Sequence, residues 1–297
     1  MEKNRSYLEQ FPHSFSIQHK ITQETEKKQL HLHEQLELIV AVSDNMSCQY
    51  EAGQLKIPAG SILLLDSLSP HYIYKNRQGQ PVDRYVLYFS SEYISRLSVP
   101  EFNLLRCFYR SHTPVPGLVQ PSADEIPTLQ LLLEDMIKSD TLRRQFSPHS
   151  PDAIAYEMET RFLLGRFLVQ LNQLYSHGED NGGVSVSSEE VNRVLFIKDH
   201  IQKYYDQPLR VEELARQFFI SKTQLYKAFH SVLGVSVGNY ILQIRIIKAK
   251  DLLRNSDCSI EMIAEKVGYQ NLSAFSRAFK AQVGISPHAF RKGRARQ

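Results

Sequence analysis

The chain has 297 residues, of which 42% are hydrophobic, and a formal net charge of +3, so it is long enough for two domains that each bury a core. Its longest apolar runs fall short of the roughly 18 residues that a membrane-spanning helix needs, and its polar start, Met1 to Arg5, is unlike a secretory signal. We therefore expect a cytoplasmic protein without a membrane partner.

Residues 1–120 carry the pattern of a series of β-strands. From about Gln29 to Phe89, short runs rich in Ile, Val, Leu and Tyr alternate with Gly, Pro, Asn, Asp and Ser, as strands alternate with turns. The clearest runs are Leu30–Val42, Gln54–Ile57, Ser61–Asp66, His71–Lys75 and Arg84–Phe89. Their spacing predicts a small antiparallel barrel.

Two histidines and a glutamate lie at even intervals in the first run. On one continuous strand His31, His33 and Glu37 would share a face, and with His71 as a fourth ligand they could hold a transition metal. Alternatively they are polar groups that line or rim a pocket for a small molecule. We favour the pocket and expect neither a metal ion nor another cofactor.

Tyrosines and one arginine add to this predicted pocket. Aromatic rings with hydrogen-bonding tips suit the apolar face and the hydroxyls of a sugar, although Tyr is also a common strand residue. We expect a carbohydrate or a related small polar metabolite as the ligand. The candidate residues are His31, His33, Glu37, His71, Tyr72, Tyr74, Arg84 and Tyr88.

The sequence of residues 121–176 predicts two helices, which are separated by a break from Ser147 to Pro151. The first follows Asp124, a candidate N-cap, and in both helices the apolar residues recur at helical spacing. After them, residues 177–189 are rich in Gly, Ser, Asn and acidic residues, which is the composition of a flexible linker.

Residues 190–297 contain one unit twice. Shifted by 50 positions, residues 221–229 fall on residues 271–279, with Leu225 on Phe275 and Lys227 on Arg277. Such a repeat, at helical spacing and with a basic residue at the same place in both copies, predicts two helix-turn-helix units. Ser221 and Asn271 precede the repeated helices as N-caps, which also favours phosphate at those ends.

The outer face of each repeated helix carries a hydroxyl and a cation one turn apart. At about 100° per residue the apolar side chains share one face, and the outward pairs are Thr223 with Lys227 and Ser273 with Arg277. Such a helix fits the major groove of DNA, where Arg or Lys reaches a guanine edge. Residues 191–297 hold 18 Lys or Arg against 8 Asp or Glu, a net charge of +10, and residues 1–190 hold 17 against 24, a net charge of −7. The charge distribution supports a DNA partner for the C-terminal third.

This C-terminal pattern resembles the DNA-binding domain of the AraC/XylS family of bacterial transcription regulators. The pattern continues from Leu225 and Phe229 through Arg245 and Gly268-Tyr269 to Gly284-Ile-Ser-Pro287. The resemblance implies that two recognition helices enter successive major grooves, held apart by a long helix, here Val237 to Arg254. By position it adds Gln224, Leu272 and Lys280 to the DNA-binding residues.

The resemblance also implies roles for the rest of the chain. His31 to Glu37, Ile57 to Gly60 and Ser69 to His71 resemble the cupin-like sensor domain of the same family. The implied fold is a multidomain α+β protein, with an antiparallel cupin-like barrel, trailing helices, and an all-α domain with two helix-turn-helix units. The implied function is an effector-responsive activator, not an enzyme, that contacts RNA polymerase. One helix of residues 121–176 would form a homodimer contact, unless both helices only cover the barrel.

Two other classes of protein stay open at this point. A cupin metalloenzyme with an accessory DNA-binding domain would need the His31, His33, Glu37 and His71 set to hold a metal. An effector-independent architectural or repair protein would use the same helix pairs without a ligand. Sequence-specific DNA binding that responds to a small molecule would exclude both.

Overall fold

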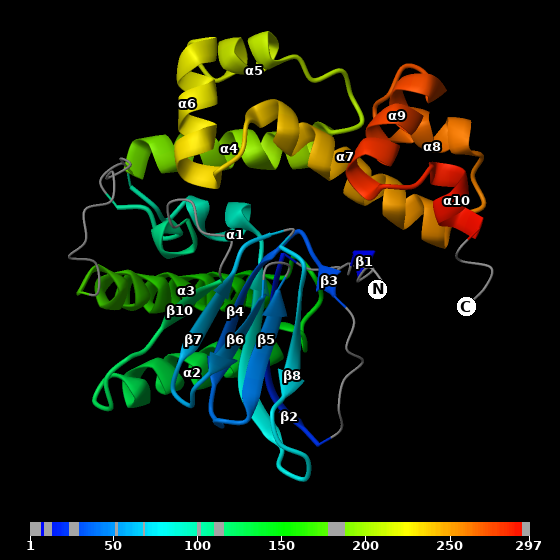
Figure 1. Ribbon diagram of the computed structural model, residues 1–297. Helices are drawn as coiled ribbons and strands as arrows, with labels where there is room; N and C mark the ends of the chain where they lie inside the picture. Colours follow the sequence, from blue (N-terminus) through cyan, green and yellow to red (C-terminus); the bar gives the residue numbers. More distant parts are fainter. Residues whose placement is uncertain are drawn as a thin grey trace. The chain divides into compact units, whose positions relative to one another are not determined.

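A computed structural model (Figure 1) describes residues 7–8, 14–23, 30–50, 53–67, 69–99, 102–109, 116–177 and 188–292. The chain divides into two compact units, Met1–Asn192 and Arg193–Gln297. Of the predicted linker 177–189, residues 178–187 lie outside the described residues. His177 is the last residue of one helix and Ser188 the first of the next.

The first unit contains two five-stranded sheets. One has the order β1 (Tyr7–Leu8), β3 (His31–Leu32), β8 (His71–Lys75), β5 (Met46–Tyr50) and β6 (Gly53–Ile57). The other has the order β10 (Gly117–Val119), β7 (Ile62–Leu65), β4 (Leu36–Ala41), β9 (Val82–Phe89) and β2 (Phe15–Thr22). Among the described strands every pairing is antiparallel except that of β1 with β3, so the predicted antiparallel architecture is confirmed.

The two sheets enclose one apolar core. Side chains from β4, β7 and β9 of one sheet and from β5 and β6 of the other form a single buried cluster. Strand alternation explains the membership, because every second residue of β4 and β9 points to the same face. The core members are Ile39, Ala41, Met46, Cys48, Ile57, Leu63, Leu65, Val82 and Val86.

The predicted single strand from Leu30 to Val42 is wrong. The chain forms β3, leaves the strand at residues 33–35, and resumes as β4 in the other sheet. Apolar periodicity is the same on both sides of this crossing, so the sequence pattern does not reveal the break. Strand β5 was also missed, because its sequence Met-Ser-Cys-Gln-Tyr is too polar to read as a buried run.

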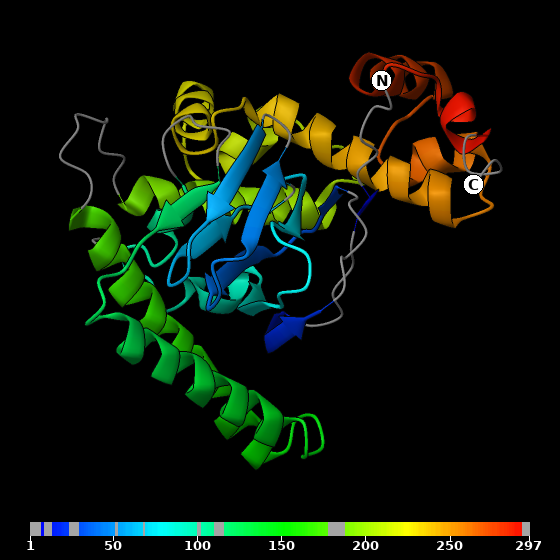
Figure 2. The same ribbon diagram turned by 60° about the horizontal axis from the view of Figure 1, so that its bottom comes forward.

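Helices follow the strands. The short helices α1 (Ser91–Ser95) and η1 (Arg106–Phe108) precede the long helices α2 (Ile126–Arg143) and α3 (Pro151–His177). Figures 1 and 2 show α2 and α3 side by side, and the Ser139 hydroxyl of α2 donates a 3.0 Å hydrogen bond to the Tyr156 carbonyl of α3. The predicted cap Asp124 is wrong, because the N-cap of α2 is Glu125.

The second unit is helical. Two helix-turn-helix units, α5 (Val211–Gln217) with α6 (Lys222–Leu233) and α8 (Ile260–Lys266) with α9 (Leu272–Val283), flank the long helix α7 (Val237–Asn255). Helix α4 (Ser188–Tyr204) precedes them and α10 (Pro287–Lys292) follows. Both α6 and α9 pack against α7. The predicted domain with two helix-turn-helix units joined by a long helix is therefore confirmed.

Over the described residues, no single helix is both long and apolar enough to cross a membrane. By length and composition alone, α6 and α7 pass that test as a pair with a 60° bend between them.

Candidate functional site

Helix α6 presents the predicted outer face. Thr223 and Lys227 are exposed, whereas Leu225 and Phe229 are fully buried. The helix starts with a reciprocal capping box, in which the Ser221 hydroxyl accepts from the Gln224 N–H at 3.2 Å and the Gln224 side-chain oxygen accepts from the Ser221 N–H at 2.8 Å. These two hydrogen bonds fix the start and the orientation of the first turn of α6.

Helix α9 repeats the arrangement. The Asn271 side chain caps it by accepting from the Ala274 N–H at 2.8 Å. Ser273, Arg277 and Lys280 are exposed, and Phe275 is fully buried. Both recognition helices end at a glycine in the left-handed region, Gly234 with φ 68° and Gly284 with φ 83°, where a residue without Cβ is favoured. The duplication seen in the sequence is thus a duplication of helix, caps and exposed residues.

Besides the caps Ser221 and Asn271, two more of the predicted DNA-binding residues have an intramolecular role in the structure. The Gln224 side chain belongs to the capping box of α6, so its oxygen is engaged with its own helix. Leu272 is half-buried and packs against the core of the second unit. Both residues therefore have an intramolecular role, whereas Thr223, Lys227, Ser273 and Arg277 are exposed on their helices.

Tyr226 is a surface residue that the sequence did not single out. Its side chain is 39% exposed and lies one turn beyond Thr223 on α6, and the Lys222 ammonium is 6.0 Å from its ring centre. Lys222 itself forms an ion pair with Glu212 of α5, which joins the two helices of the first helix-turn-helix. The i to i+3 spacing from Thr223 is the signal that could have identified Tyr226.

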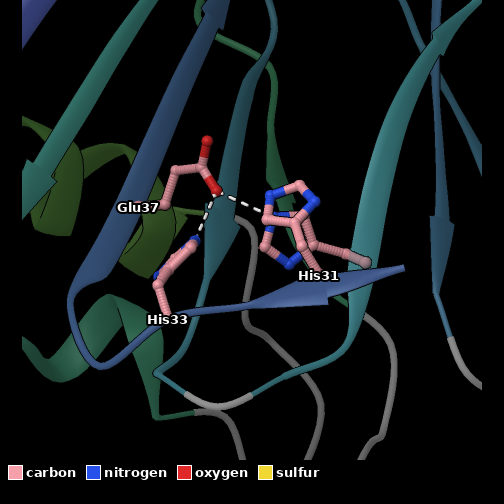
Figure 3. A group of neighbouring side chains, drawn as sticks. His31, His33 and Glu37 are labelled. Carbon is pink, nitrogen blue, oxygen red and sulfur yellow. Dashed lines mark hydrogen bonds and ion pairs between the residues drawn. The ribbon is translucent and has the colours of Figure 1, made fainter. Parts of the chain in front are cut away.

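In the barrel, the four predicted metal or pocket residues converge on one point (Figure 3). His31 lies on β3, His33 follows it, Glu37 lies on β4, and His71 lies on β8 directly opposite His31. One ligand atom from each residue lies within 4.8 Å of all the others. They come together because the chain crosses between the sheets at His33, and not because they share one strand.

The cluster is buried and centred on a carboxylate. His33, Glu37 and His71 are each at most 2% exposed, and the Glu37 Oε2 atom is 2.9 Å from His33 Nε2 and 2.8 Å from His71 Nε2. Burial alone would raise the pKa of Glu37, but the hydrogen bonds and positive charge offered by the two imidazoles outweigh it and hold that pKa well below its usual value. Glu37 is therefore a carboxylate.

The other residues of the predicted pocket do not form one group. Tyr88 joins the cluster, with its ring centre 5.2 Å from that of His33. Side chains alternate between the two faces along β8, so Tyr72 and Tyr74 lie on the face opposite to that of His71. Arg84 is buried and donates to the Thr22 hydroxyl at 2.8 Å, four residues along β9 from Tyr88, about 13 Å away.

A family model described as a helix-turn-helix domain matches residues 214–293. Among curated proteins, the Msm operon regulatory protein of Streptococcus mutans is 38% identical over 117 residues, covering 39% of this chain and 40% of that protein. The regulator ExsA of Pseudomonas aeruginosa is 33% identical over 185 residues, covering 62% and 61%. RafR of Pediococcus pentosaceus, a raffinose operon regulatory protein, is 28% identical over 144 residues, covering 48% and 50%. The match therefore spans less than two thirds of each of these three curated relatives.

Solved structures give similar matches. The C-terminal domain of AraT, a response regulator from Geobacillus stearothermophilus, is 35% identical, covers 34% of this chain and 85% of that one, and has a TM-score of 0.34. Fatty-acid-bound ToxT from Vibrio cholerae is 14% identical, covers 98% and 97%, and has a TM-score of 0.47. With the domain match and the curated relatives, residues 214–293 form an AraC-type helix-turn-helix domain, and the chain is similar to AraC-family transcription regulators.

Proposed function

We propose that this protein is a sequence-specific transcription regulator that reads double-stranded DNA with α6 and α9. The observation that carries the proposal is the structural duplication: each helix exposes a hydroxyl and a cation one turn apart, Thr223 with Lys227 and Ser273 with Arg277. A short hydroxyl side chain and a cation are suited to base edges in the major groove. The net charge of +10 over residues 191–297 supports the attraction to a polyanion.

The length of α7 supports binding to two successive turns of DNA. A helix of 19 residues is about 28 Å long, and successive major grooves on one face of DNA lie about 34 Å apart. Because α6 and α9 both pack against α7, that helix sets their separation. A protein of this shape binds one face of the duplex with both helices at once.

The N-terminal domain is proposed as the sensor. We assign the barrel to residues 1–120, the helical region to 121–176, the linker to 177–189 and the DNA-binding domain to 190–297. The ligand is a carbohydrate or another small polar metabolite, and the name of the raffinose operon relative supports this class. The protein acts in the cytoplasm, and it is proposed as a regulator and not as an enzyme.

Helix α3 carries a surface suited to a second copy of the chain. Ile154, Met158 and Phe162 are 49%, 49% and 55% exposed and lie four residues apart, so they form one apolar stripe. The stripe is symmetric about Met158, and Asp152 and Arg166 line the same groove on either side of it. In an antiparallel pair of α3 helices, Ile154 would face Phe162 of the other copy and opposite charges would meet at both ends. This self-complementarity supports a two-fold homodimer.

The proposed mechanism is a shift between two arrangements of the dimer. An effector that binds the sensor more tightly in one arrangement shifts the equilibrium toward that arrangement, at most by the ratio of its two affinities. If the favoured arrangement places both DNA-binding domains on adjacent half-sites, the effector activates transcription, with RNA polymerase as the final partner.

The test starts by incubating the purified full chain with sheared genomic DNA and sequencing the bound fragments. We expect enrichment of a few intergenic sites that contain repeated half-sites one or two helical turns apart. On the best site, Lys227→Ala and Arg277→Ala should each weaken binding by about 1 to 3 kcal/mol. Lys56→Ala removes an exposed cation of β6 in the barrel and should bind that site like the parent.

Three outcomes of these binding measurements distinguish the proposed function from its alternatives. Loss in both recognition-helix variants with an unchanged Lys56→Ala supports the proposal. Equal binding by all three variants would refute the assignment of α6 and α9. Enrichment without sequence preference, in the presence and absence of a sugar library, would favour an architectural DNA-binding protein.

A further inference from the structure

The arrangement of donors and acceptors in the histidine cluster favours a bound cation. His33 Nδ1 is 2.9 Å from the Gln35 carbonyl oxygen and His71 Nδ1 is 2.8 Å from the Ser69 carbonyl oxygen. A carbonyl oxygen only accepts, so each Nδ1 must carry the hydrogen. In a neutral imidazole the other ring nitrogen, Nε2, then carries only a lone pair.

Both of these Nε2 atoms face the same acceptor. The Glu37 Oε2 atom lies 2.9 Å from His33 Nε2 and 2.8 Å from His71 Nε2, and a carboxylate oxygen has no hydrogen to donate. Two neutral imidazoles would thus point lone pairs at an anion.

We propose that His31, His33, Glu37 and His71 bind one divalent first-row transition-metal ion. Three imidazole nitrogens and one carboxylate oxygen converge on one point and can all donate electron pairs to such an ion. Three nitrogen ligands and one oxygen ligand suit Zn²⁺, Co²⁺, Ni²⁺ or Fe²⁺ and do not suit Ca²⁺ or Mg²⁺, which prefer oxygen. The site stands on the barrel alone and holds whether or not the proposed DNA function is correct.

The distances fit such an ion after small side-chain shifts. Ligand atoms about 2.1 Å from one tetrahedral ion lie about 3.4 Å apart. The Glu37 Oε2 atom lies 2.8 Å and 2.9 Å from two of the imidazole nitrogens, and all four candidate atoms lie within 4.8 Å of one another. To reach that separation, the closest ligand atoms must move apart and the most distant must move together, each by roughly an ångström. Rotation of the carboxylate and of the half-buried His31 ring can supply this.

The surroundings of the cluster already resemble those of a metal site. Metal-binding histidines usually donate their second N–H to a carbonyl or a carboxylate, which fixes the ring and its tautomer. The carbonyls of Gln35 and Ser69 do this for His33 and His71. The ion would also join the two sheets, since Glu37 lies on β4 of one sheet and His31 and His71 lie on β3 and β8 of the other.

The experiment uses the full chain without an affinity tag, stripped with a chelator and titrated with Co²⁺, whose visible absorption reports ligand number and geometry. We expect saturation at one Co²⁺ per chain, an intense visible band, and displacement of that band by Zn²⁺. His71→Gln and His31→Gln should weaken Co²⁺ binding by at least about 100-fold. His31 is only half-buried, so His31→Gln remains informative if His71→Gln does not fold.

The matched control is His19→Gln. His19 is another barrel histidine beside a carboxylate, 2.7 Å from Asp83, but its side chain is 37% exposed, and it should bind Co²⁺ like the parent. The absence of saturable uptake by the folded parent would overturn the proposal. Equal uptake by the parent and His31→Gln, with circular dichroism showing both folded, would also overturn it, because the ion would then lie elsewhere.

Discussion

Arg245 and Gly268 share one small space: a Cβ built on Gly268 would lie 2.8 Å from the Arg245 Nη2 atom. Arg245, on α7, donates from Nε to the Tyr205 carbonyl and from Nη2 to the Gln207 carbonyl, both at 2.8 Å. The turn between α8 and α9 passes over this contact at Gly268, where φ is 83°. One guanidinium therefore ties the end of α4 to α7, and a glycine allows the second helix-turn-helix to pack onto it.

Gly268→Ala should destabilise the DNA-binding domain by about 2 to 5 kcal/mol. The left-handed backbone costs an alanine about 1 to 2 kcal/mol, and the added methyl would lie 2.6 Å from the Tyr205 carbonyl oxygen, which adds an overpacking cost of about 1 to 3 kcal/mol. Urea unfolding of the full chain, followed by helical circular dichroism, measures the loss.

The first helix-turn-helix provides the matched position. Phe219 holds the same place in its turn, with φ 55° and 95% exposure. Phe219→Gly relieves backbone strain of about 1 kcal/mol in the folded chain, but glycine also gives the unfolded chain more conformational freedom, which costs a similar amount. The free energy of unfolding of this variant should therefore differ from that of the parent by less than about 1 kcal/mol. Equal losses in both variants would contradict the packing argument for Gly268.

The sequence predicted the DNA-binding domain well because its signals are local. Each recognition helix is short, starts at a capping residue and ends at a glycine, and its buried residues recur at helical spacing, so Ser221, Phe229 and Gly234 predict much of α6 without knowledge of the rest. The structure confirmed the caps and the exposed pairs. Phe219 was not predicted, because nothing local indicates that an aromatic residue occupies a left-handed turn.

The barrel was predicted less accurately because its arrangement depends on contacts between distant strands. His31 and His71 are 40 positions apart in the sequence and directly opposite in the sheet, which no spacing rule reveals. The histidines were correctly grouped with Glu37, but for the wrong reason: the grouping assumed one strand, and the chain instead crosses between two sheets at His33. The tyrosines of β8 were placed with them because strand composition does not show which face each residue occupies.

Met158→Glu should abolish the proposed homodimer. It places a charge at the centre of the apolar stripe on α3, where a two-fold axis would bring it beside its copy. Sedimentation equilibrium should show a monomer for the variant and a dimer for the parent. Leu131→Glu adds the same charge to another exposed apolar residue, 63% exposed on α2, and should remain a dimer. Dimers in both variants would exclude the α3 stripe as the interface.

Stability should fall at high pH through Tyr85. Burial, together with its hydrogen bond to Glu134 of α2, raises the pKa of Tyr85 from 10 to about 12. The folded chain therefore keeps a proton that the unfolded chain loses, so this stabilisation is complete below about pH 10 and disappears as the pH rises through about 12. Unfolding of the parent and of Tyr85→Phe should differ by a constant amount below about pH 10 and converge above it. A constant difference up to about pH 12 would contradict the raised pKa.

Arg277 and Lys280 should differ in what they read, although both are exposed cations of α9. Arg277 lies one turn beyond Ser273 on the outer face of the helix, so it is placed to reach a guanine edge, whereas Lys280 lies in the last turn, where a phosphate contact is expected.

Arg277→Ala should cost about 1 to 3 kcal/mol of binding free energy on the preferred site and relax the preference at one base position. Lys280→Ala should weaken binding to all sequences alike and lower the slope of log K against log salt by about 1. Binding to a set of single-base variants of the site, measured at several salt concentrations, separates the two effects. A uniform loss for Arg277→Ala with an unchanged base preference would show that this arginine contacts the backbone, and base reading by α9 would then have to come from Ser273 or Leu272.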